Sequence, residues 1–241
     1  MGRKRRSKKR RLAIRTVFIL FLIVGGFFAY LKLTENNVPP PEGIRPLAKD
    51  FNSHGIDVSR YQGKVDWEVL FSNSDSLISF VYFKATEGST LIDPQFKRNL
   101  STLREMEIPL GAYHYFKPNL SAVDQAQHFL KVYLPGQDDL PPVLDVEEEG
   151  TDDEEFKSKV QLFLEIVENT TGRQPIIYTN YYLYSTKLQS AFSDYKFWIA
   201  NYSDKAERMD DDKIICWQYS DRGKLPGIEG FVDLNMSKIK F

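Results

Sequence analysis

Strand-like and helix-like segments alternate along this chain from His54 to its end. Short apolar runs rich in β-branched and aromatic residues predict strands, and amphipathic segments between the first five runs predict helices. The predicted strands are 55–58, 77–85, 109–116, 142–147, 176–179, 196–200, 214–219 and 231–234. The predicted helices are 66–71, 94–106, 121–133 and 153–170.

This alternation predicts an α/β fold with a parallel sheet, because each helix returns the chain to the same end of the sheet. Eight strands in fewer than 190 residues favour a small, closed or nearly closed, TIM-like β/α barrel. The last three connections are too short or too irregular for good helices, so we expect the barrel to be incomplete there.

Polar residues stand at the ends of most predicted strands, which is where barrel enzymes keep their chemistry. Stability alone does not explain a ring of residues in which carboxylates dominate. The ring comprises Asp57, Lys84, Glu87, His114, Tyr115, Asp145, Glu147, Asn180, Asn201, Gln218 and Asp233.

Asp145 and Glu147 are the strongest catalytic candidates in this ring. They end the apolar run 141–144 with one residue between them, so strand alternation predicts that both point to the same face, with Cα atoms roughly 6.5 Å apart. Two carboxylates that close cannot ionise independently, and the one that stays protonated can act as a general acid. Glycoside hydrolysis needs such a pair. The acidic residues that follow, from Glu148 to Asp153, are interpreted as a solvated loop.

The N-terminal part predicts a membrane anchor. Residues 1–15 contain nine basic residues and no acidic one, and they precede an uncharged apolar run, 16–31, that Lys32 closes. The positive-inside rule then leaves 1–15 in the cytoplasm as a basic head, with 16–32 as a single transmembrane signal-anchor. A cleaved signal peptide is the main alternative for this segment, and a nuclear-localisation or nucleic-acid patch is another for the basic cluster.

The Pro-containing segment 33–53 is predicted as a linker, and 54–241 as the folded domain outside the cytoplasm. From Leu33 onward the chain has 22 basic and 33 acidic residues, which argues against a nucleic-acid partner. The single cysteine, Cys216, allows no internal disulfide and is expected to be a buried apolar residue. His54 and His128 show no metal-ligand spacing.

A set of short stretches in shared order makes the chain similar to the glycoside hydrolase family 25 lysozymes, over 54 to about 237. They begin with His54-Gly-Ile-Asp-Val-Ser-Arg-Tyr-Gln-Gly63, Val65-Asp-Trp67, Phe83-Lys-Ala-Thr-Glu-Gly88, Asp93-Pro94 and Gly111-Ala-Tyr-His-Tyr-Phe116. They continue with Leu144-Asp-Val-Glu147, Ile177-Tyr-Thr-Asn180, Trp198-Ile-Ala200, Trp217-Gln-Tyr-Ser220 and Val232-Asp-Leu-Asn235.

This resemblance implies a flattened (β/α)5β3 barrel that cleaves the β-1,4 bond between N-acetylmuramic acid and N-acetylglucosamine in peptidoglycan. It implies that Glu147 is the proton donor and that Asp145 assists the N-acetyl group of the substrate as internal nucleophile. The implied substrate-binding residues are Asp57, Asp233, Tyr113, Tyr115, Trp217 and Tyr219, of which alternation turns only some inward. The resemblance implies no metal and no organic cofactor, and we expect a monomer. The N-terminal anchor departs from the secreted members of the family.

Other interpretations stay open for these residues. Asp57 could cap the turn at 59–62, Asp233 could be a structural loop acid, and Glu87 could pair with Lys84. His114 alternates with two tyrosines and is expected to be a hydrogen-bonded structural histidine. Two alternative functions also remain, namely a catalytically silent glycan-binding module that tethers the cell wall and a glycosidase for another amino-sugar polymer such as chitin. Retention of both Asp145 and Glu147 favours the muramidase.

Overall fold

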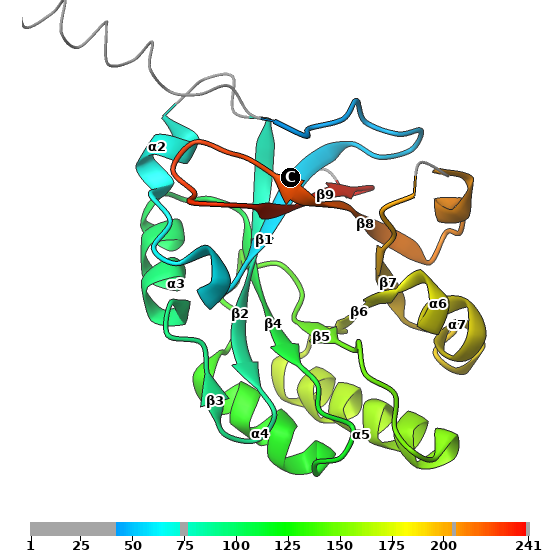
Figure 1. Ribbon diagram of the computed structural model, residues 1–241. Coiled ribbons are helices and arrows are strands. Elements are labelled where there is room, and N and C mark those ends of the chain that lie inside the picture. The colour runs from blue at the N-terminus through cyan, green and yellow to red at the C-terminus, as the bar shows by residue number, and fades with distance from the viewer. Residues whose placement is uncertain (1–41, 73–76, 204–205, 240–241) are drawn as a thin grey trace, which may run out of the picture. The chain divides into compact units, whose positions relative to one another are not determined.

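The computed structural model describes residues 42–72, 77–203 and 206–239 (Figure 1). They belong to the second of two compact units, Pro41–Phe241. The basic head, the expected membrane span and most of the expected linker lie outside the described residues. Among those described, no helix has the length and apolar character needed to cross a membrane.

The folded unit begins earlier than the expected boundary at His54. Glu42 forms a β-bridge with Lys224, and Phe51 is buried with its ring 6.0 Å from the ring of Trp217. Residues 42–53 of the expected linker therefore pack against the domain, because burial of the apolar Phe51 side chain is favourable. The proline content of the segment gave no sign of this contact.

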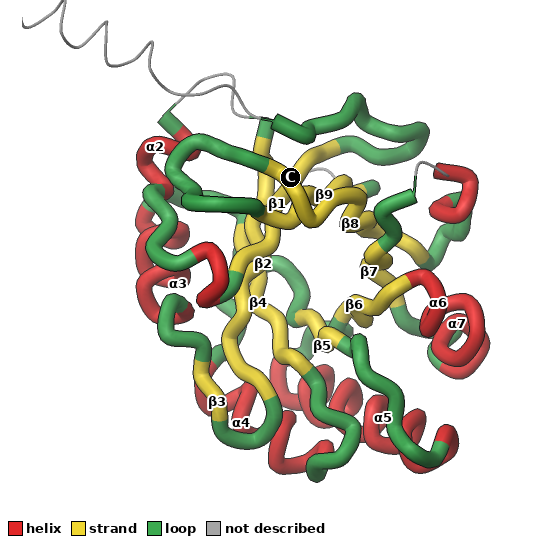
Figure 2. Tube along the Cα trace, in the orientation of Figure 1, coloured by secondary structure: helices red, strands yellow, loops and turns green. Residues whose placement is uncertain are grey.

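The described residues form nine strands, of which eight form a closed ring (Figure 2). The strands are β1 (Ser53–Val58), β2 (Ile78–Glu87), β3 (Leu91–Ile92), β4 (Leu110–Tyr115), β5 (Val143–Asp145), β6 (Ile176–Asn180), β7 (Lys196–Ala200), β8 (Ile214–Gly223) and β9 (Val232–Ser237). β1 pairs with both β2 and β9, and this closes the ring; β3 only extends β2 as a short antiparallel arm. The barrel prediction is confirmed, but the ring of strands is complete, and only the helical layer around it is incomplete.

Helices follow the strands as expected in the first part of the barrel. They are α2 (Trp67–Phe71), α3 (Phe96–Glu105), α4 (Ala122–Val132) and α5 (Asp153–Thr171). The β6–β7 connection contains three short helical pieces, namely α6 (Tyr181–Leu183), a π-helical turn (Tyr184–Leu188) and α7 (Gln189–Ala191). A 3-10 turn (Ala206–Met209) precedes β8, and loops alone precede β9. Five β/α units followed by three strands match the (β/α)5β3 expectation.

Local sequence signals explain where these helices begin and end. The side chain of Asp66 accepts a hydrogen bond from the Val69 amide at the start of α2, as an N-cap does. Asp152 caps α5 in the same way, and Gly172 ends α5 in the left-handed conformation at φ 67°.

One strand departs from the parallel arrangement that the alternation predicts. β9 runs antiparallel to both of its neighbours, β8 and β1. A short loop without a helix can join only antiparallel neighbours, and the β8–β9 connection is of that kind. β9 therefore enters the ring in the opposite direction and closes it.

Strand alternation separates two apolar regions. The barrel interior contains Phe80, Tyr82, Trp198 and Cys216, whereas the larger core lies outside the ring under the helices. Gly111 makes room inside the barrel, because a Cβ atom there would lie 2.2 Å from the ring of Tyr82. Cys216 is buried, as expected.

Candidate active site

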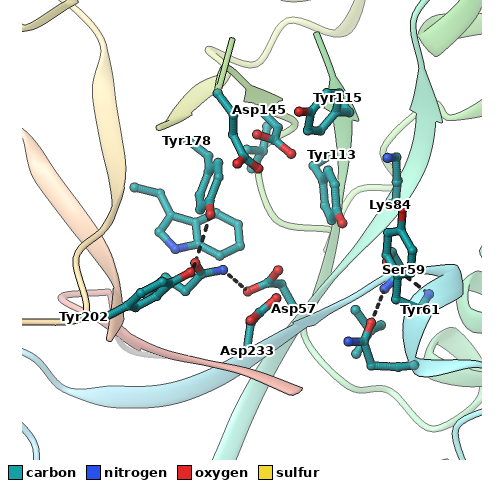
Figure 3. Close-up of a pocket in the computed structure, with 16 residues that line it drawn as sticks. Asp57, Ser59, Tyr61, Lys84, Tyr113, Tyr115, Asp145, Tyr178, Tyr202 and Asp233 are labelled. Carbon is teal, nitrogen blue, oxygen red and sulfur yellow. Dashed lines mark hydrogen bonds between the residues drawn. The ribbon is translucent and has the colours of Figure 1, made fainter. Parts of the chain in front are cut away.

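A cavity of about 220 Å³ opens at the carboxyl ends of the parallel strands, and residues from most of the ring line it (Figure 3). Polar and aromatic side chains dominate its wall, as sugar binding requires. The lining residues are Asp57, Val58, Ser59, Tyr61, Gln62, Lys84, Tyr113, Tyr115, Val143, Asp145, Glu147, Tyr178, Trp198, Tyr202, Gln218 and Asp233.

Asp145 and Glu147 both line this cavity, as strand alternation predicts. β5 ends at Asp145, but a hydrogen bond of 2.8 Å from the Val146 amide to the Tyr178 carbonyl continues the extended backbone by one residue. Asp145 is only 5% exposed, and its Oδ1 atom has no hydrogen-bond partner among the described residues. Glu147 is exposed and lines the same cavity.

The environment favours the protonated form of both carboxyl groups. Burial, followed by the charge of Glu147, raises the pKa of Asp145 well above its ordinary value. Withdrawal from bulk water also raises the pKa of Glu147, although a hydrogen bond with Asp145 and the charge of Lys84 oppose this shift. Because the pKa of both carboxyl groups is raised, the pair favours a state that retains a proton.

Asp57 and Asp233 form a second pair of carboxyl groups in the same cavity. They are direct neighbours in the antiparallel β1–β9 ladder. Oδ2 of Asp57 accepts hydrogen bonds from the side-chain amides of Gln218 (2.9 Å) and Asn235 (2.8 Å). Burial raises the pKa of Asp57 to about 6, although these two neutral donors oppose the shift. Burial and the nearby charge of Asp57 raise the pKa of Asp233 further, to about 9. The pair therefore holds its proton on Asp233.

Of the four aromatic residues expected to bind sugar, only two line the cavity. Tyr113 and Tyr115 face it from β4. Trp217 and Tyr219 do not, and the expectation that they would is wrong. Inward-facing Gln218 lies between them in β8, so alternation turns both rings outward into the outer core, where the indole N–H of Trp217 donates to the Asn201 carbonyl at 2.7 Å.

The structure adds lining residues to which sequence reasoning assigned no role. Tyr178 and Trp198 occur in the stretches Ile177–Asn180 and Trp198–Ala200 that carry the family resemblance, and strand alternation could have placed them inward. Lys84 and Gln218 were in the predicted polar ring. Tyr61, Gln62 and Tyr202 lie on connections between strands, where no periodic pattern exists to predict their direction.

His114 and Glu87 have structural surroundings. His114 is fully buried between Thr86 Oγ1, 2.7 Å from Nδ1, and Gln125 Oε1, 3.2 Å from Nε2. Burial lowers its pKa to about 3, so the ring stays neutral, as expected for a structural histidine. Glu87 pairs with Lys84 at 2.6 Å. The turn at 59–62 is capped by Ser59 and not by Asp57.

No metal centre is evident in the ranges 42–72, 77–203 and 206–239: no three or more His, Cys, Asp or Glu side chains there are grouped to hold an ion.

A β/α barrel with paired carboxyl groups at the strand ends is the arrangement of a glycoside hydrolase. The sequence matches the family described as Glycosyl hydrolases family 25 over residues 56–228, and the chain belongs to that family. It is an enzyme of the glycoside hydrolase class with lysozymes and muramidases among its homologues.

The similarity extends over most of the chain. The uncharacterized protein YegX of Escherichia coli K12 is 43% identical over 204 residues, which cover 80% of this chain and 75% of that protein. The autolytic lysozyme of Clostridium acetobutylicum is 31% identical, covering 75% of this chain and 54% of the lysozyme. A family 25 glycosyl hydrolase structure from Bacillus anthracis superposes with a TM-score of 0.74 at 28% identity, covering 83% of this chain and 94% of that one.

Proposed function

We propose that this enzyme hydrolyses the β-1,4 bond between N-acetylmuramic acid and N-acetylglucosamine in peptidoglycan. In this proposal Glu147 is the general acid and Asp145 assists the N-acetyl group of the substrate. The observation that carries it is the convergence of these two carboxyl groups in one cavity, in surroundings that raise the pKa of both.

In the reacting state of this proposal, Glu147 is protonated and Asp145 is ionised. Glu147 donates a proton to the glycosidic oxygen while the acetamide oxygen of the muramic acid attacks C1, and the C1–O bond breaks to form an oxazolinium ion. Oδ1 of Asp145, which has no partner in the protein, is available to accept the acetamide N–H, and its charge stabilises the cation. Glu147, now ionised, takes a proton from water as that water attacks C1. The C1–O bond of the oxazolinium ring breaks, and both the N-acetyl group and the acid are restored.

Product analysis tests this assignment directly. Purified peptidoglycan is incubated with the full chain in detergent, the products are reduced with borohydride, and their masses are measured. Cleavage at the proposed bond yields reduced N-acetylmuramic acid at the new chain end. Reduced N-acetylglucosamine at that end would refute the bond assignment.

The same assay separates the two alternative functions. A silent glycan-binding module would bind peptidoglycan and release nothing, whereas a glycosidase of another amino-sugar polymer would degrade chitin in preference to peptidoglycan. Two carboxyl pairs with raised pKa values in one cavity favour catalysis over binding, because binding a neutral sugar needs no such pairs.

We further propose that residues 16–32 anchor the enzyme, as a monomer, in the membrane with residues 1–15 in the cytoplasm. The catalytic domain then faces the periplasm or the cell exterior, where it remodels the wall of its own cell. The support is the basic cluster before an uncharged run. Cell fractionation with N-terminal sequencing tests this, since a soluble mature protein that begins near Tyr30 would refute the anchor.

A further inference from the structure

The loop that carries Glu147 has little regular structure of its own. β5 ends at Asp145 and α5 begins at Asp153, so residues 146–152, here called the acid loop, connect the two. Val146 is fully buried and forms the last ladder-like hydrogen bond. From Glu147 onward the loop depends on its side chains for its position. The acidic residues expected to form a solvated loop are indeed largely exposed, but Glu148 and Glu149 also form ion pairs.

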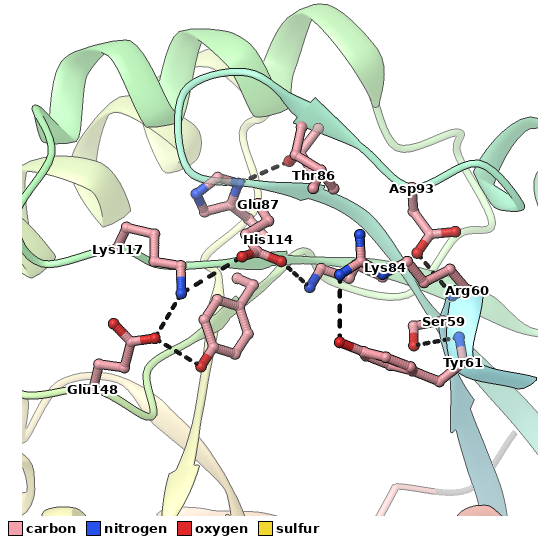
Figure 4. A network of polar contacts seen from close by, with 12 residues as sticks. Ser59, Arg60, Tyr61, Lys84, Thr86, Glu87, Asp93, His114, Lys117 and Glu148 are labelled. Atoms are coloured by element: carbon pink, nitrogen blue, oxygen red, sulfur yellow. Dashed lines mark hydrogen bonds and ion pairs between the residues drawn. The ribbon is translucent and has the colours of Figure 1, made fainter.

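Lys117, from the β4–α4 connection, holds one side of the acid loop (Figure 4). Its Nζ atom lies 2.6 Å from Oε1 of Glu148, the residue directly after Glu147, and 3.5 Å from Oε1 of Glu87. The phenol of Tyr115 donates to the same Glu148 oxygen at 3.2 Å, and Lys117 lies 4.6 Å from the centre of the Tyr115 ring. Glu148 therefore forms an ion pair with Lys117 and accepts a hydrogen bond from Tyr115, a residue that lines the cavity.

Lys187, from the π-helical turn in the β6–β7 connection, holds the other side. Its Nζ atom lies 2.5 Å from Glu149 and 2.6 Å from Asp153, and its side chain is only 19% exposed. It therefore joins the last part of the acid loop to the start of α5. These two carboxylates raise the pKa of Lys187, so it stays charged throughout the range in which the enzyme can act.

We propose that Lys117 and Lys187 are positioning residues that clamp the acid loop from both sides and so hold Glu147 in the cavity. This proposal rests on the proposed role of Glu147 as general acid. The lysines come from the two connections that flank β5 in the barrel, so the loop is held between them.

Exposed ion pairs contribute little to global stability, and a purely structural role would leave the rate unchanged. Alignment of a catalytic group is far more sensitive, since a displacement of about 1 Å can cost about 100-fold in rate. Loss of the clamp should therefore lower kcat and increase the local motion of the acid loop, while the melting temperature stays nearly constant.

Lys187 gives the cleaner test, because it contacts no residue that lines the cavity. Lys187→Met should lower kcat about 10-fold with little change in KM, and Lys187→Arg should restore most of the rate because it keeps the charge. Glu149→Gln combined with Lys187→Met should cost less than the sum of the single effects, because both break the same pair. Lys157→Met is the matched control, since its partner Glu154 lies in α5, outside the acid loop.

Hydrogen exchange of the amides at 147–152 measures the local opening of the acid loop and does not require catalysis. These amides should exchange faster in Lys187→Met than in the wild type or in Lys157→Met. Faster exchange supports the clamp even if the wild type cleaves no peptidoglycan, in which case the proposed function fails and the clamp does not. Unchanged exchange, or additive effects in an active enzyme, would overturn the clamp alone.

Discussion

The side-chain amide of Gln218 donates a hydrogen bond of 2.9 Å to Oδ2 of Asp57, a residue 161 positions earlier in the chain. The carbonyl oxygen of the same amide accepts from the phenols of Tyr178 (2.9 Å) and Tyr202 (2.8 Å). Because a phenol donates to the oxygen, the nitrogen must face Asp57. Gln218 thus opposes the rise that burial causes in the pKa of Asp57, and so favours Asp233 as the carboxyl group that holds the proton of the pair.

Gln218→Glu should therefore destabilise the protein, because it replaces a donor by an acceptor and places a third carboxylate beside Asp57 and Asp233. We expect the free energy of unfolding at neutral pH to fall by about 1–3 kcal/mol. Urea denaturation measures it, with Gln137→Glu as the control that adds the same charge at an exposed position. Equal stability of the two variants would show that the Gln218 amide does not support Asp57.

Glu147→Gln should lower peptidoglycan cleavage by about 100- to 10,000-fold, since an amide cannot donate a proton to the leaving oxygen. The side chain is exposed, so folding should be intact. Rates of product release and the melting temperature are measured together. Glu154→Gln on α5 is the control, and it should keep most of the activity because Glu154 lies outside both the cavity and the acid loop. Near-native turnover by Glu147→Gln would remove it as the general acid.

Asp145→Asn should lower kcat by a comparable factor while KM stays the same or falls. The charge of Asp145 is needed only when the oxazolinium ion forms, so its removal affects the transition state and not substrate binding. Steady-state kinetics with soluble peptidoglycan fragments separate the two parameters. A normal kcat with a raised KM would make Asp145 a binding residue.

Activity should be highest at acidic to near-neutral pH. A general acid works only while protonated, so the rate falls as the pH rises through the pKa of Glu147, which burial raises above its ordinary value. Asp145 and Lys84 oppose the rise, and Glu148 adds to it. Initial rates between about pH 3 and about pH 10 give the profile. A rate that still increases beyond about pH 9 would contradict a carboxyl general acid.

Asp233→Asn should stabilise the protein at neutral pH. Burial and Asp57 raise the pKa of Asp233 above 3.8, so the folded state retains a proton that the unfolded state releases. The free energy of unfolding therefore decreases as the pH rises above 3.8 towards the pKa of the folded state. Removing this group should add about 1–2 kcal/mol at neutral pH and progressively less near pH 4. Thermal denaturation at both pH values tests this, and a constant difference would exclude the ionisation of Asp233 as its cause.

Local patterns were sufficient for the barrel and for its main carboxyl pair. The period of two in a strand places Asp145 and Glu147 on one face, and it places Tyr113 and Tyr115 on one face with His114 opposite. Helix caps such as Asp66 and Gly172 are equally local, because each acts within a few residues of its own position. These signals do not depend on how the strands are arranged.

Long-range contacts decided the rest. Alternation groups Trp217 with Tyr219 but cannot say which face of β8 looks into the barrel, and only the pairing with β7 and β9 turns Gln218 inward. The pairing of β9 with β1, which closes the ring across almost the whole domain, also has no local signal. Lys187 pairs with Glu149 of the acid loop and with Asp153, which lies 34 positions earlier in the chain. Nothing in the local sequence of either segment signals these pairs. The burial that shifts the pKa values of Asp57, Asp145 and Asp233 likewise arises only when all the strands enclose one cavity.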